Sequence, residues 1–79
     1  MNIKNILNQG KHILKINKIP NPQLDSELLL SEAINKAKEY IVFNPKKNLD
    51  GTQLKKFNNL IERRKKGEPI AYLVNKKEF

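Results

Sequence analysis

Hydrophobic residues recur every three or four positions along the first segment of the chain. Isoleucine or leucine occupies positions 3, 6, 7, 13 and 14, and lysines and asparagines fill most of the positions between them. This spacing predicts an amphipathic α-helix from about Asn2 to Asn17. Gly10 falls on the apolar face, although glycine in a helix interior costs about 1 kcal/mol relative to alanine. We therefore expect another helix to cross closely at Gly10.

A second helix is predicted after the sequence KIPNP. Asn21 fits the N-cap position, and Pro22 fits the first helical position, where its missing N–H is not needed. Asp25 and Glu27 then lie near the positive end of the helix dipole, which is a sufficient structural reason for both acids. The apolar positions form a stripe wide enough for a helix that is covered on more than one side: Leu24, Leu28, Leu29, Leu30, Ala33, Ile34 and Ala37.

The rest of the chain also favours short helices. The apolar segment KEYIVF, residues 38–43, has no partner strand elsewhere in the sequence, so we expect a short helix that ends before the Asn-Pro pair. Asp50 and Gln53 have the spacing of a capping box at the start of the next helix. Gly67 fits the left-handed residue that closes that helix, and Pro69 fits the first turn of a last one. The prediction is an all-α bundle of four to five short helices without a sheet.

Length and composition limit the classes of function. The chain has 79 residues, no cysteine and a single histidine, so it is one small domain without thiolate chemistry or a multi-histidine metal site. Its three glycines are isolated, so no phosphate or dinucleotide loop is present. We expect no catalytic, cofactor-binding or metal-binding residue within this chain. No apolar run approaches the roughly 20 residues of a membrane span, and no signal-peptide core is present, which favours a cytoplasmic domain without membrane contact.

The formal net charge of +8 is unevenly distributed. Residues 1–20 carry four lysines and no acid, and residues 45–66 carry six lysines and two arginines against two acids. Such clustering is typical of a nucleic-acid surface, and a small RNA-binding module is one alternative. However, only two of the sixteen basic residues are arginine, and the chain is rich in Lys, Asn and Ile throughout. We favour a compositional bias that fills solvent-facing positions with lysine.

The end of the chain resembles a known family. The stretch FNNLIERRKKGEPIAYLVNKKEF is similar to the pattern F..L..RR..GEPIAYL.G..EF of the HemK/PrmC family, and NPQLDSELLLSEAI is similar to its P..DAELLL...L helix. One departure is Asn75, where the family usually has glycine. The matching residues are Pro22, Leu24, Asp25, Glu27, Leu28, Leu29, Leu30, Phe57, Leu60, Arg63, Arg64, Gly67, Glu68, Pro69, Ile70, Ala71, Tyr72, Leu73, Glu78 and Phe79.

The resemblance implies a function for a longer parent protein. Family members transfer a methyl group from S-adenosylmethionine to the glutamine of the Gly-Gly-Gln motif in class I peptide chain release factors. Residues 1–74 would form the helical substrate-recognition domain, and residues 75–79 would begin the linker to a methyltransferase domain that this chain lacks. That missing domain would carry the S-adenosylmethionine loop and the catalytic Asn-Pro-Pro-Tyr motif, so this chain itself would be non-catalytic.

Two sets of residues follow as candidates. Contacts with the release factor or with the parent's own methyltransferase domain are expected at Arg63, Arg64, Glu68, Ile70, Tyr72 and Phe79. Structural roles are expected for Gly10, Asn21, Pro22, Asp50, Gly67 and Pro69. Glu68 is expected either to cap the last helix or to pair with Arg64. A further alternative is that the domain is purely a structural cap that orients the catalytic domain.

Overall fold

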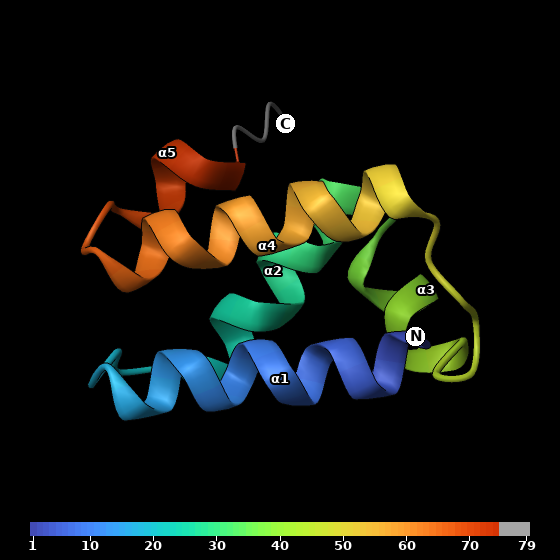
Figure 1. The fold of residues 1–79 in the computed structure, drawn as a ribbon, viewed down its shortest axis with the longest axis horizontal. Coiled ribbons are helices and arrows are strands. Elements are labelled where there is room, and N and C mark those ends of the chain that lie inside the picture. Colours follow the sequence, from blue (N-terminus) through green and yellow to red (C-terminus); the bar gives the residue numbers. More distant parts are fainter. Residues whose placement is uncertain (75–79) are drawn as a thin grey trace.

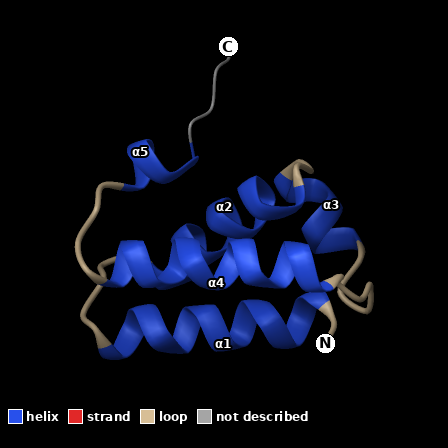
Figure 2. Ribbon diagram, turned by 45° about the horizontal axis from the view of Figure 1, so that its top comes forward, coloured by secondary structure: helices blue, strands red, loops and turns tan. Residues whose placement is uncertain are grey.

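The structure is a computed structural model that describes residues 1–74. Five helices account for most of this part of the chain (Figure 1): α1 (Ile3–Ile16), α2 (Pro22–Ile34), α3 (Lys38–Phe43), α4 (Gly51–Lys65) and α5 (Ile70–Val74). No strand occurs in the described residues (Figure 2). An isolated antiparallel bridge pairs Asn2 with Asn48. The predicted all-α fold is therefore confirmed, including the short helix formed by KEYIVF.

Helix α2 lies at the centre of the bundle and contacts each of the other four helices. Helices α1 and α4 lie side by side and run in the same direction, and α5 packs on α2 and α4 (Figure 1). The expectation that α2 is covered on more than one side is confirmed. Its most N-terminal leucine, Leu24, nevertheless remains 44% exposed, whereas Asp25 and Ser26 are buried. Ala37 is also exposed, and it precedes α3 instead of extending α2.

Gly10 allows α1 and α4 to approach closely, as its place on the apolar face predicts. A Cβ atom at Gly10 would lie 2.7 Å from Cζ of Phe57 and 3.1 Å from Cδ1 of Ile61. Both of these α4 side chains are almost fully buried, so they have little room to move aside. A larger side chain at position 10 would therefore press directly on the core.

The start of α1 is tied to the loop between α3 and α4. The side chain of Asn2 caps the first turn, and the backbone N–H groups of Ile3 and Lys4 donate to the carbonyls of Lys47 and Pro45, each at 2.9 Å. Helix N-termini leave such N–H groups without partners inside the helix. The loop carbonyls therefore complete the end of α1 and fix the position of the loop.

The two predicted N-caps behave differently. Asp50 forms the expected capping box: its Oδ1 accepts from the backbone N–H of Gln53 at 2.7 Å, and Gln53 Oε1 accepts from the N–H of Asp50 at 3.1 Å. Asn21 occupies the N-cap position before Pro22, but the expected side-chain cap is wrong because its side chain makes no capping hydrogen bond. Its backbone ψ of 69° lies far from the extended value of 173° that Asp50 uses to aim its side chain at the first turn.

Candidate functional site

Helix α4 ends where the chain turns sharply into α5, and this corner contains most of the predicted contact residues. Gly67 has a φ of 102°, which places it in the left-handed region that favours glycine. The N–H of Gly67 donates to the carbonyl of Arg64 at 2.9 Å, and the N–H of Glu68 donates to the carbonyl of Arg63 at 3.2 Å. This pair of bonds is a Schellman motif, so the predicted role of Gly67 is confirmed.

Arg64 points into the domain and joins the corner to α2. Its Nε donates to Oδ2 of Asp25 at 2.9 Å, and its Nη1 donates to the backbone carbonyl of Glu68 at 2.9 Å. The two side chains of the ion pair are only 17% and 7% exposed, respectively. One guanidinium group therefore holds together the first turn of α2, the last turn of α4 and the segment that leads into α5.

Glu68 pairs with the other arginine of the corner. Its Oε1 and Oε2 accept from Nη2 and Nε of Arg63 at 2.8 and 3.0 Å, a two-point contact on the protein surface. The hydrogen bond from Arg63 lowers the pKa of Glu68, and the same contact raises the pKa of Arg63. The expected pairing of the Glu68 side chain with Arg64 is wrong, because Arg64 lies on the inner face of α4 and reaches Asp25 instead.

The basic run RRKK is largely paired with acids of the same domain. In addition to the two arginine pairs, Nζ of Lys65 lies 3.1 Å from Oε2 of Glu62. The acceptors of both arginines, Glu68 and Asp25, lie within residues 1–74. Sequence reasoning missed Asp25 as a partner, because the helix dipole alone is enough to account for an acid in the first turn of α2.

Helix α5 divides its residues between the core and the surface. Leu73 and Val74 are buried, and Ile70 is half-buried against the same core. Tyr72 is 76% exposed, which is high for a large aromatic side chain. Pro69 lies one residue before α5 and not within its first turn, and its carbonyl accepts from the N–H of Tyr72 at 3.1 Å.

The predicted contact residues thus fall into two groups. Arg63, Glu68 and Tyr72 are at the surface of the corner, whereas Arg64 and Ile70 face inward. Phe79 lies outside the described residues. Residues 1–74 enclose no pocket for a small molecule, and no three potential metal ligands gather there. None of the five described helices has both the length and the apolar character that a membrane crossing requires.

Comparisons with known proteins identify a family and several related sequences. The model of the PrmC N-terminal domain family matches residues 5–74. A bifunctional methyltransferase of Rickettsia bellii is 43% identical over 77 residues, which are 98% of this chain and 14% of that protein. The release factor glutamine methyltransferase of Buchnera aphidicola from Acyrthosiphon pisum is 42% identical over 79 residues, 100% of this chain and 28% of that protein.

A more distant relative is the release factor glutamine methyltransferase of Aliivibrio fischeri, which is 35% identical over 79 residues, again 100% of this chain and 28% of that protein. The chain spans less than about a third of each of these relatives. No solved structure matches it. Since the family model covers nearly the whole helical bundle, the chain belongs to the PrmC N-terminal domain family.

Proposed function

We propose that this chain is the N-terminal substrate-recognition domain of a longer, cytoplasmic release factor methyltransferase. The parent protein would methylate the glutamine of the Gly-Gly-Gln motif in class I peptide chain release factors, using S-adenosylmethionine. The proposal is supported by relatives named release factor glutamine methyltransferase that align with the whole chain at 42% and 35% identity. Residues 1–74 would be the recognition domain, and residues 75–79 would begin the linker to the catalytic domain.

Methyl transfer is assigned to the remainder of the parent. S-adenosylmethionine does not fit the described residues, which provide neither an enclosing pocket nor a glycine-rich loop. Two of the three buried polar residues in the described part of the chain have partners within the domain: Asp25 pairs with Arg64, and the hydroxyl of Ser31 donates to the carbonyl of Lys36. The third, Ser26, has no hydrogen-bond partner for its hydroxyl within residues 1–74. We assign to this domain the role of holding the protein substrate.

The single observation that best supports a docking surface is the exposed aromatic ring of Tyr72 at the α4–α5 corner. Tyr72 projects from α5, whose neighbours Leu73 and Val74 anchor the helix in the core. Next to α5, the Arg63–Glu68 pair offers both a cation and a carboxylate at the surface. Exposed aromatic and arginine residues held by a rigid scaffold are typical of protein–protein contact sites. We assign this surface to the release factor, with the parent's catalytic domain as the competing occupant.

The other candidate functions receive less support. An RNA-binding surface on the basic end of α4 would have part of its charge neutralised, because Arg63, Arg64 and Lys65 each pair with an acid of this domain. A purely structural cap would need apolar residues free to pack on a neighbouring domain. Ile70 and Leu73, two apolar residues of α5, pack against this domain's own core instead.

The test is a titration of the isotope-labelled chain with a purified class I release factor, followed by amide chemical shifts. We expect shifts to concentrate on α5 and on the turn at residues 66–69. A parallel titration with the parent's separate catalytic domain shows whether that domain uses the same amides. No perturbation at about millimolar release factor would refute direct docking.

A further inference from the structure

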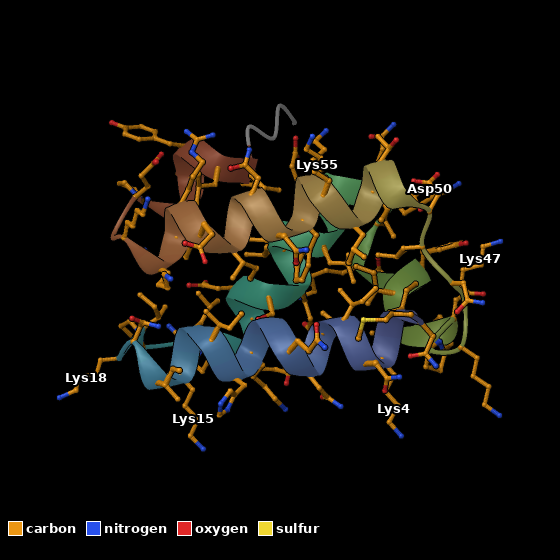
Figure 3. The ribbon with its side chains drawn as sticks, viewed as in Figure 1. Lys4, Lys15, Lys18, Lys47, Asp50 and Lys55 are labelled. Carbon is orange, nitrogen blue, oxygen red and sulfur yellow. The ribbon has the colours of Figure 1, made fainter. Side chains whose placement is uncertain are left out.

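Four lysines lie along α1 or directly after its end, of which Lys4, Lys15 and Lys18 are exposed and Lys11 is half-buried. Lys4, Lys11 and Lys15 are spaced by seven and four positions, which places them on one side of a helix. Lys18 follows directly after the end of α1. Figure 3 shows Lys4, Lys15 and Lys18 projecting from the side of α1 that faces away from α4, whereas Lys55 projects on the opposite side of the molecule. We call these four residues the α1 lysine face.

The α1 lysine face has no acidic partner among residues 1–74. All three ion pairs found among residues 1–74 use basic residues from the end of α4, and none involves a lysine of α1. Helix α2 packs against α1 and carries Glu27 and Glu32, but neither carboxylate lies within 4.0 Å of these lysines. Glu27 instead accepts a hydrogen bond from Nε2 of Gln23 at 2.6 Å.

The helix dipole explains only part of this arrangement. Lys15 lies in the last turn of α1, where a cation is favourable, but Lys4 lies in the first turn, where a cation is unfavourable and an acid would be expected. The first turn contains no acid at all. The helix dipole therefore disfavours Lys4, and Lys4 is aligned with other lysines that have no ion-pair partner in the described part of the chain. This arrangement favours an external anion as the ligand of the α1 lysine face.

The chemistry of the face selects among anionic ligands. Lysine ammonium groups bind phosphate as point charges, whereas carboxylate recognition favours the planar fork of arginine. Residues 1–20 contain no Phe, Tyr or Trp on which single-stranded bases would stack. The apolar face of α1 is buried through Ile3, Ile6 and Leu14, so the helix has no apolar side free to insert into a membrane.

The length of the face fits a double helix. Lys4 and Lys15 are eleven positions apart, which corresponds to about 17 Å along the helix axis. A nucleic-acid duplex carries one phosphate charge per about 1.7 Å of its axis, so a segment of this length carries on the order of ten phosphates, of which those on the facing side can reach the lysines. We propose that the α1 lysine face binds the sugar–phosphate backbone of a nucleic-acid duplex without reading the bases. This function goes beyond release factor recognition and uses a different surface of the domain.

The test measures binding of the chain to a fluorescent 20-base-pair RNA duplex by anisotropy at several salt concentrations. The triple variant Lys4→Gln, Lys11→Gln, Lys15→Gln is compared with a matched control, Lys55→Gln, Lys56→Gln, Lys66→Gln, which removes the same number of charges from the α4 side. Circular dichroism verifies that both variants are folded. A DNA duplex of the same sequence and phosphatidylserine vesicles serve as alternative anionic ligands.

We expect the unmodified chain to bind with a log–log salt slope of about −3.6, because the face has four lysines and each lysine–phosphate contact contributes about −0.9. The α1 variant should bind about tenfold more weakly at about 50 mM salt, with a slope reduced by two or more, while the α4 control changes by less than about twofold. Equal binding to the DNA duplex agrees with backbone contact. Equal weakening by both variants, no duplex binding at about 50 mM salt, or binding to vesicles alone would overturn the proposal.

Discussion

The guanidinium of Arg64 and the carboxylate of Asp25 meet at 2.9 Å although they are 39 positions apart in the sequence. Asp25 belongs to the helix segment PQLDSELLL and Arg64 to the segment RRKKGEP, so the pair connects the two stretches that carry the family resemblance. Because Arg64 also donates to the carbonyl of Glu68, the same side chain fixes the direction in which the chain enters α5. The position of Tyr72 therefore depends on a buried ion pair.

Replacing Arg64 with methionine should lower the free energy of unfolding by about 3 kcal/mol, because it leaves the buried carboxylate of Asp25 without a partner. The double variant Asp25→Leu, Arg64→Met should lose much less than the sum of the two single changes, since no unpaired charge remains. Urea denaturation followed by circular dichroism measures all three variants. Additive losses would show that the two side chains do not act as a pair.

Gly10→Ala tests the close approach of α1 and α4. Alanine improves helix propensity by about 1 kcal/mol, but here its Cβ would meet the buried ring of Phe57, and overpacking of this kind costs about 1–3 kcal/mol. We expect a net loss of stability in the natural background. In a Phe57→Leu background the ring is absent, so the same Gly10→Ala change should become neutral or stabilising. An identical loss in both backgrounds would contradict a steric origin of the effect.

The elements that depend on neighbouring positions were predictable from the sequence. The apolar spacing of α1 and α4, the Asp50–Gln53 capping box and the left-handed Gly67 each depend on residues within one or two turns. The close helix crossing was also predictable, because glycine lowers the stability of a helix interior and is favoured on an apolar face where a second helix leaves no room for a Cβ atom.

Features that depend on distant residues were not predictable. Helix α2 is apolar on several sides, so the sequence does not show which side stays open, and Leu24 is exposed while Asp25 is buried. The burial of Asp25 requires an arginine from the other end of the chain. The choice of Glu68 between two adjacent arginines follows from the inward direction of Arg64, which only the packed structure defines.

Lys18→Gly should stabilise the domain. Lys18 has a φ of 64°, and the Schellman-type bonds from its N–H to the carbonyl of Lys15 and from Ile19 to Leu14 hold it there. A residue with a Cβ loses roughly 1 kcal/mol in this left-handed region, which glycine adopts without strain. We expect the midpoint of urea denaturation to rise accordingly. The control Lys15→Gly, inside α1, should lower stability by about 1 kcal/mol.

Glu68→Gln should reduce the pH dependence of stability in the acidic range. The pKa of Glu68 is lowered below its ordinary value of 4.5 by the hydrogen bond from Arg63, so its contribution is complete above that value. The contribution is lost as the pH falls through the lowered pKa. The variant should therefore be less stable than the natural chain at neutral pH, and the difference should disappear as the pH falls below the lowered pKa of Glu68. Arg63→Gln should also reduce the pH dependence of stability in the acidic range, because it removes the hydrogen bond that lowers the pKa of Glu68.

Tyr72→Ala should separate partner binding from folding. Because Tyr72 is 76% exposed, we expect its removal to change the free energy of unfolding by less than about 0.5 kcal/mol. Loss of a central aromatic contact should weaken binding of the release factor by about tenfold, measured from the same amide shifts used to detect docking. Phe43→Ala is the matched control, since Phe43 is an equally exposed aromatic residue, 79% accessible, on α3. If both variants weaken binding to the same extent, the α4–α5 corner is not the preferred docking surface.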